Sequence, residues 1–424
     1  MQIDGKSTMS EQKPPSLWNR NFLLLWQGQL VSSLGDNFYA IALGFWVLEK
    51  TGSTGLMGTL MAVSTLPRVL ISPFAGVWVD RTERRSLLIA MDVIRGLASA
   101  GVGLAAFAGH LEIWMVFAAG IVLSVCGSFF GPAVSSAIPD IVPPEQIVQA
   151  NSVFSLAYNG TSIIGTAGGG FLYQALKAPL MFLFDGFSYI FSAAAILFMR
   201  IPAVKHQSQK VSFFQDMKGG LLFVKNFNGL KYSFLIFGVL NFFANIGFFL
   251  ILPMFQKIPF LGAGKYGIVM GVLTGGSFLG YLLASTIKIP TAKRFMVFYL
   301  GALMSAACMA LFPVHVTMIY MSAMAVLIGL SIAVVNALIS AVMQITVPQD
   351  MRGKVFGLLG TMAGSLTPIA FAVGGWLGEV FPIRPLMSGC FILTFGAFFV
   401  LIFVPSVIRF FNFDPSKQTL EEIM

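Results

Sequence analysis

The chain has 424 residues, of which 57% are hydrophobic and only 10% are charged. Soluble domains carry roughly 25% charged residues, so this composition excludes an ordinary soluble protein, and its apolar content excludes a disordered one. We attribute the net charge of +9 to Lys and Arg held on one side of a membrane rather than to nucleic-acid binding. The apolar runs are continuous rather than alternating, which favours spanning helices over a β-barrel.

Twelve apolar segments are long enough to cross a bilayer as helices, which takes about 20 residues each. In chain order they cover approximately 22–48, 56–79, 87–108, 113–138, 151–176, 179–200, 232–256, 265–287, 295–313, 316–343, 354–378 and 385–409. The polar N-terminal tail has no apolar core, so we expect no cleaved signal peptide. The predicted fold is an all-α membrane protein with a tail (1–21), a six-helix half (22–200), a central loop (201–231), a second six-helix half (232–409) and a C-terminal tail (410–424).

The basic residues support this map. Of the 26 Lys and Arg residues, 19 fall on one side of the predicted membrane and five on the other, with two inside spans. Because basic residues are retained in the cytoplasm, this asymmetry predicts a multi-pass protein of the cell membrane with both termini and the central loop cytoplasmic.

The central loop contains an amphipathic helical pattern. Phe213, Met217, Gly220, Val224 and Phe227 fall near one face, and lysines lie elsewhere. This pattern predicts a short helix on the inner leaflet that tethers the two halves. A connecting helix with no further role is the alternative.

The two halves contain similar segments in the same order. The loop 141–145 precedes Val153-Phe154, and the loop 346–350 precedes Val355-Phe356. Residues 169–172 (GGFL) likewise match 374–377 (GGWL), at an offset of 202–205 residues throughout. A shared order and offset favour two related six-helix repeats, the construction of many transporters.

The loop between the second and third spans carries a charged motif, G-x-x-x-D-R-x-x-R-R. Its members are Gly76, Asp80, Arg81, Arg84 and Arg85. We expect the glycine to let two helices approach closely, the aspartate to accept hydrogen bonds from a helix N-terminus, and the arginines to pair with acidic groups or lipid phosphates. Contacts that form in one conformation and break in another would make a cytoplasmic gate. An orientation signal alone is the alternative.

With this motif in this loop, the sequence resembles the major facilitator superfamily over most of its length. Three further stretches resemble the macrolide-efflux-type branch of bacterial exporters: 35–39 (GDNFY) with 51–53 (TGS), 66–68 (LPR), and 92–95 (DVIR). The resemblance implies a secondary transporter that works by alternating access. Proton-coupled drug antiporters that it resembles often carry a proline where Thr166 stands and an arginine in span four that is missing here, which counts against proton antiport.

Charged residues inside the spans are functional candidates, because charge in the bilayer costs at least about 2.5–3.5 kcal/mol. They are Asp36, Arg68, Asp92, Arg95 and Asp185. Asp36 and Arg68 lie near mid-depth on consecutive spans, so we predict that they pair, with Asp36 as the coupling carboxylate. Asp92 and Arg95 are spaced i,i+3 and are expected to form a structural or gating pair. Asp185 is expected to lie shallow and partly hydrated.

Uncharged polar residues recur at helical spacing in four spans. The resemblance implies that these helices line a central cavity, so their polar residues are candidate substrate contacts; interhelical hydrogen bonding is the alternative. The candidates are Gln29, Ser33, Tyr39, Ser155, Tyr158, Asn159, Asn241, Asn245, Asn336 and Ser340.

The sequence therefore predicts a monomeric exporter of amphipathic organic compounds, coupled to protons and embedded in the bilayer. A transporter of the same fold with another cargo, such as a siderophore, a lysophospholipid or a metal ion, is the alternative. We expect no enzyme activity, cofactor, resident metal or nucleic-acid partner, because metal-ligand clusters and a G-x-x-x-x-G-K-[ST] phosphate loop are both missing.

Overall fold

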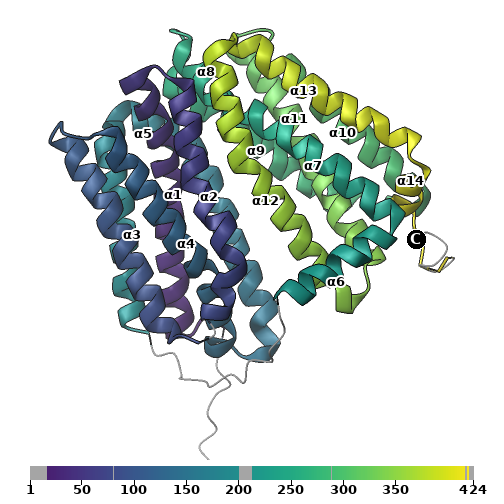
Figure 1. The fold of residues 1–424 in the computed structure, drawn as a ribbon, viewed down its shortest axis with the longest axis horizontal. Helices are drawn as coiled ribbons and strands as arrows, with labels where there is room; N and C mark the ends of the chain where they lie inside the picture. Colours follow the sequence, from purple (N-terminus) through teal and green to yellow (C-terminus); the bar gives the residue numbers. More distant parts are fainter. Residues whose placement is uncertain (1–16, 80, 200–212, 288, 416–417, 420–424) are drawn as a thin grey trace, which may run out of the picture.

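Long apolar helices form both halves of the molecule (Figure 1). The computed structural model describes residues 17–79, 81–199, 213–287, 289–415 and 418–419. The first half contains α1 (Arg20–Thr51), α2 (Thr54–Val79), α3 (Arg84–Phe107), α4 (Ile113–Ile141), the 3₁₀ turn η1 (Pro144–Gln146) and α5 (Ile147–Leu197). The second half contains α6 (Phe213–Asn226), α7 (Asn228–Phe249), α8 (Ile251–Lys257), α9 (Gly262–Thr286), η2 (Thr291–Lys293), α10 (Arg294–Leu311), α11 (Met318–Thr346), α12 (Gln349–Val380), α13 (Ile383–Val400), η3 (Leu401–Phe403) and α14 (Pro405–Phe411).

The helix ends follow local sequence signals. Asn19 caps α1, because its side-chain oxygen accepts the Phe22 N–H at 3.0 Å. Gly52 ends the helix with φ at 67°, a left-handed conformation that glycine adopts without strain, and its N–H bonds to the Leu48 carbonyl. At the other end of the chain the predicted twelfth span is interrupted: α13 stops at Val400, and Pro405 starts α14, where its missing N–H costs nothing.

Two predicted spans are joined in α5. Lys177 breaks the helix with φ at 60° and ψ at 175°. Before it, α5 packs along α1 in parallel, because Thr161 meets Ser33 and Gly165 meets Asn37. After it, the order reverses, since Ser188 meets Gly35 while Ser192 meets Gly28.

This reversal settles the number of spans. Eleven helices among the described residues are long and apolar enough to cross a membrane, and α5 is counted once among them. Because α5 crosses twice, the predicted twelve-helix fold in two halves is confirmed.

The two halves share one core at one end of the molecule and have separate cores at the other. We call the shared end the top, where α1 ends and α2 begins, and the opposite end the base (Figure 1). The top core combines residues of both halves, such as Phe45 and Met57 with Phe249 and Leu252. Toward the base, one core is built only from residues 17–199 and another only from residues 224–413. The halves can therefore tilt about the top with their basal cores intact.

Glycine pairs bring the halves together at the top. A Cβ on Gly375 of α12 would lie 2.8 Å from the Cα of Gly58 in α2. A Cβ on Gly170 of α5 would lie 2.9 Å from the Cα of Gly267 in α9. Only glycine permits this backbone approach. The repeated sequence 169–172 and 374–377 thus forms two equivalent crossings.

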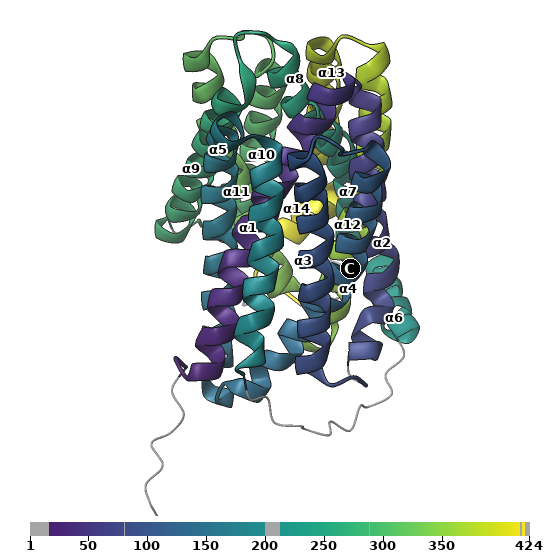
Figure 2. The same ribbon diagram turned by 90° about the vertical axis from the view of Figure 1, so that its left-hand side faces the viewer.

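The helix predicted in the central loop is present as α6. It lies near the base beside α12 in Figure 1, and Figure 2 shows it at the right edge of the molecule, below the middle. The predicted apolar face packs on the second half: Gly220 lies against the Lys354 backbone, while Val224 and Phe227 belong to the second basal core. The expectation that this face contacts the inner leaflet was therefore wrong at these three positions.

Candidate functional site

A stripe on α1 faces the second half. Asp36, Ala40 and Gly44 succeed one another at four-residue intervals and therefore share one side of the helix. At the top of the stripe, Gly44 lies against Leu252 of α8. Ala40 and Asp36, below it, are exposed. Asp36 thus opens into the space between the halves.

Asp36 lies at the edge of a buried polar cluster. The hydroxyl of Tyr189 in α5 donates a hydrogen bond to its carboxylate. Arg95 of α3 stacks with its guanidinium carbon 4.3 Å from the Tyr189 ring centroid and 4.0 Å from that of Phe130. Its charge is balanced by an ion pair with Asp92, which is fully buried. The predicted contact between Asp92 and Arg95 is confirmed, and it holds the arginine beside Asp36.

Asp185 is more enclosed by protein than predicted. It is completely buried rather than partly hydrated, because the second segment of α5 packs directly on α1 at Gly35. One carboxylate oxygen accepts the Ser99 hydroxyl at 2.7 Å. The other has no hydrogen-bond partner among the described residues. Asp36, which is open, and Asp185, which is buried against Gly35, therefore lie at the same level along α1.

The predicted pair between Asp36 and Arg68 does not form. The ion pairs among the described residues join Arg84 to Asp140 and Arg95 to Asp92. Arg68 is exposed on α2 instead, and its side chain lines a pocket with α12. The position of a residue along its helix says nothing about the direction in which its side chain points, and the prediction of this pair lacked that direction.

The charged motif acts within the first half in this conformation. Arg84 pairs with Asp140 at the end of α4, and Arg85 donates to the carbonyls of Ile196 and Leu197, where a cation suits the C-terminus of α5. Arg81 is exposed, and Asp80 lies outside the described residues.

The expected close helix approach at Gly76 is wrong for this conformation. A Cβ there would meet nothing within 4 Å, because the halves are apart at the base.

The ten predicted cavity residues divide into three groups. Ser33 bonds to Thr161 at 2.8 Å, and Tyr39 packs on Phe182, so both are buried in helix contacts rather than in a cavity. The half-buried residues are Gln29, whose amide nitrogen has no partner among the described residues, and the pair Asn241 and Asn245, of which Asn245 donates to Asn241. The exposed residues are Ser155, Tyr158, Asn159, Asn336 and Ser340.

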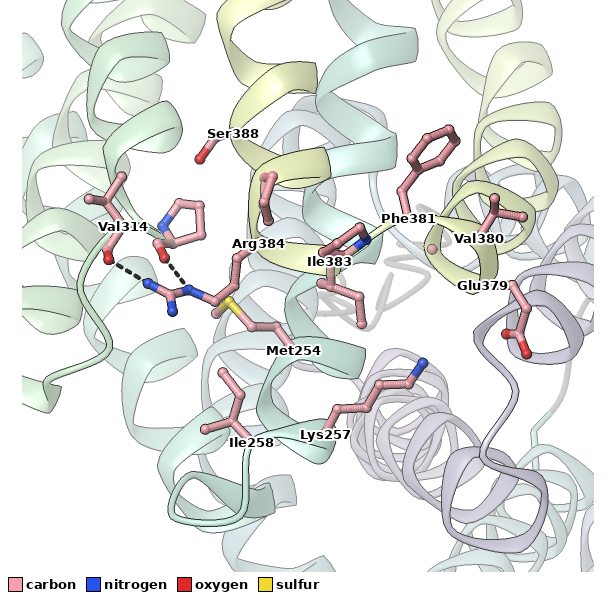
Figure 3. Close-up of a pocket in the computed structure, with 14 residues that line it drawn as sticks. Met254, Lys257, Ile258, Val314, Glu379, Val380, Phe381, Ile383, Arg384 and Ser388 are labelled. Carbon is pink, nitrogen blue, oxygen red and sulfur yellow. Dashed lines mark hydrogen bonds between the residues drawn. The ribbon is translucent and has the colours of Figure 1, made fainter.

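A further pocket lies elsewhere, at the top of the second half (Figure 3). It measures about 800 Å³ and is bordered by Lys257, Glu379 and Arg384. Arg384 is already engaged, because it donates to the carbonyls of Pro313 and Val314. All residues that line the pocket belong to the second half, and its Arg384 side chain holds the loop at 313–314, so we do not assign the transported compound to it.

Glu379 forms a contact between the halves that the sequence did not predict. Its carboxylate accepts the N–H groups of Thr54 at 2.7 Å and Gly55 at 3.1 Å, together with the Ser53 hydroxyl at 3.2 Å. It therefore caps the N-terminus of α2 from α12, where negative charge is favoured. Tyr189 was also missed, although it continues the polar spacing of Asp185 in the sixth span.

Comparisons with known proteins agree with this architecture. The family model described as Major Facilitator Superfamily matches residues 25–372. Macrolide efflux protein A of Streptococcus pyogenes is 26% identical over 391 residues, covering 89% of this chain and 93% of that protein.

Solved structures show the same fold. The nucleoside transporter NupG superposes with a TM-score of 0.69 at 13% identity, over 92% of this chain and 100% of that one. A bacterial homolog of the human lysosomal transporter Spinster, in an inward-facing and unoccupied conformation, gives a TM-score of 0.64 at 14% identity, over 93% and 97% of the two chains.

Proposed function

Because the chain belongs to the major facilitator superfamily, and is thus a membrane transporter and not an enzyme, we propose that it exports amphipathic organic compounds from the cell in exchange for protons. We assign the base to the cytoplasm, since most Lys and Arg residues fall in segments at that end. With the top closed by glycine crossings, the structure then represents the state that loads cargo from inside. The macrolide efflux relative favours a drug-like cargo over the siderophore, lysophospholipid or metal ion.

One observation carries the coupling part of the proposal: Asp36 opens into the space between the halves, and on its other side it accepts a hydrogen bond from Tyr189, whose ring stacks with the buried Arg95. A carboxylate there can hold either a cationic compound or a proton, but not both. Tilting of the halves exposes it to one side and then to the other. Export of cargo and entry of a proton are linked when the two compete for this group.

The test is transport by Asp36→Asn in inverted membrane vesicles with an imposed pH gradient. We expect uphill accumulation of a lipophilic cationic dye to fall to the level of empty vesicles, because asparagine cannot exchange a proton. Downhill dye movement should persist. Lys225→Gln, an exposed change on α6, serves as the control for expression and insertion. Gradient-driven accumulation by Asp36→Asn equal to that of wild type would refute proton coupling at this residue.

A further inference from the structure

We propose that Arg68 forms a substrate subsite for a carboxylate or a similar anionic group, so that the preferred cargo is amphoteric, with its cationic end near Asp36. The inference rests on the proposed function and names the chemical class of its substrate. It begins from the finding that Arg68 and Asp36 share the space between the halves without pairing.

The backbone and side chain of Arg68 have different partners. Its backbone N–H contacts the Ser124 hydroxyl oxygen of α4 at 3.1 Å, which anchors α2 within the first half. Its side chain lines a pocket of about 390 Å³ together with Val69 and Ser72 of its own helix. No hydrogen bond or ion pair to its guanidinium is found among the described residues.

The opposite wall of this pocket leaves room for a ligand. It is supplied by α12 of the second half, through Gly357, Gly360, Thr361, Gly364 and Ser365. A Cβ built on any of the three glycines would meet nothing within 4 Å. A bound group can therefore lie against bare backbone, and it would touch both halves at once.

The chemistry of the lining indicates an anion. A guanidinium presents five N–H donors in a planar fork that fits a carboxylate with two parallel hydrogen bonds. The other polar side chains of the lining are the hydroxyl groups of Ser72 on α2 and of Thr361 and Ser365 on α12, and the lining residues include no acidic side chain. Because the Arg68 side chain is exposed and has no ion-pair partner among the described residues, an anionic ligand can pair with it without displacing another group.

Closure of the base would tighten this subsite, because α2 and α12 belong to different halves and would converge there. An amphoteric compound could then bridge the halves through Arg68, while its amine lies near Asp36 on α1. A purely cationic compound would use Asp36 alone.

The experiment measures binding rather than transport, with two rhodamine dyes that share the cationic ring system. One carries a free carboxylate and the other carries it as an ethyl ester. Purified protein in nanodiscs is titrated with each dye and followed by fluorescence anisotropy. We expect the wild type to bind the free acid more tightly than Arg68→Gln does, by about tenfold, and Arg68→Lys to keep part of this preference. Ester binding should be the same in all three.

Lys225→Gln removes the same charge from an exposed position outside the pocket and controls for the overall electrostatic field. The subsite proposal fails if the wild type does not bind the free acid, if it shows no preference that depends on Arg68, or if Arg68→Gln weakens both dyes equally. These outcomes leave the proposed export function standing, because that function is judged by Asp36→Asn in vesicles. If the wild type shows no proton-driven export in vesicles but keeps its preference for the free acid, only the proposed function is refuted.

Discussion

At the scale of single residues, Tyr189 determines how Asp36 is held. Its hydroxyl is the one hydrogen-bond donor to this carboxylate among the described residues. Its ring also carries the Arg95 guanidinium, 4.3 Å from the centroid. The two contacts use different parts of the side chain. Replacing Tyr189 with phenylalanine removes the hydroxyl and keeps the ring, so it tests the hydrogen bond alone.

We therefore expect Tyr189→Phe to slow proton-driven export by roughly tenfold or more, because a hydrogen bond to a charged group contributes about 1.5–3 kcal/mol. The measurement is the initial rate of dye accumulation in vesicles at a fixed pH gradient. Tyr173→Phe is the matched control, since it removes a hydroxyl bonded to Glu49 near the top at 2.6 Å. An equal loss in both variants would mean that the hydroxyl at position 189 has no special role.

At the scale of helices, backbone contact between glycines determines how closely the halves meet. Gly375 lies against Gly58 and the Thr54 carbonyl, and an alanine Cβ would stand 2.8 Å and 2.9 Å from these backbone atoms. Backbone cannot move aside as a flexible side chain can, so α12 and α2 must separate. Replacing Gly375 with alanine therefore destabilises the closed arrangement of the helices at the top.

We predict that Gly375→Ala shifts the protein toward states with the top open. Spin labels at Lys50 and Phe260, which are exposed near the top of different halves, report their separation by pulsed electron paramagnetic resonance, after replacement of the three buried cysteines. The variant should show a larger share of long distances. Gly389→Ala on α13, where a Cβ meets nothing within 4 Å, should leave the distribution unchanged. Identical distributions for wild type and Gly375→Ala would contradict the prediction.

The sequence predicted the helices well because apolar length is a local property. It predicted the ion pair of Asp92 and Arg95 for the same reason, since i,i+3 spacing on one helix fixes their proximity. It failed for Asp36 and Arg68, because residues on two helices need a known rotation of each helix as well as a known depth. The stripe of Asp36 and Gly44 indicated the rotation of α1. The sequence did not indicate what this stripe faces, because Leu252, which contacts Gly44, lies in the other half.

At the scale of the whole molecule, Glu379 joins the halves where they pivot. It reaches from α12 to three donors at the start of α2, 324–326 residues earlier in the chain. The repeats place Gln174 at the equivalent position on α5, where its amide oxygen lies against Gly264 at the start of α9. One crossing therefore carries a formal negative charge and the other is neutral, so the top closure is electrostatically asymmetric.

We predict that Glu379→Gln weakens the top closure, because the amide keeps the shape of the carboxylate but loses the charge that the α2 N-terminus favours. A charge at a helix N-terminus contributes about 0.3–1 kcal/mol when exposed, so the ratio of open to closed tops should rise by up to roughly fivefold. The labels at Lys50 and Phe260 measure this ratio, and Glu49→Gln, whose bond to Tyr173 stays within the first half, is the control. If export requires the top to open and reclose, Glu379→Gln should also leak protons through vesicles in the absence of cargo. A closed population equal to that of wild type would show that the glycine crossings suffice and that the Glu379 cap does not control the gate.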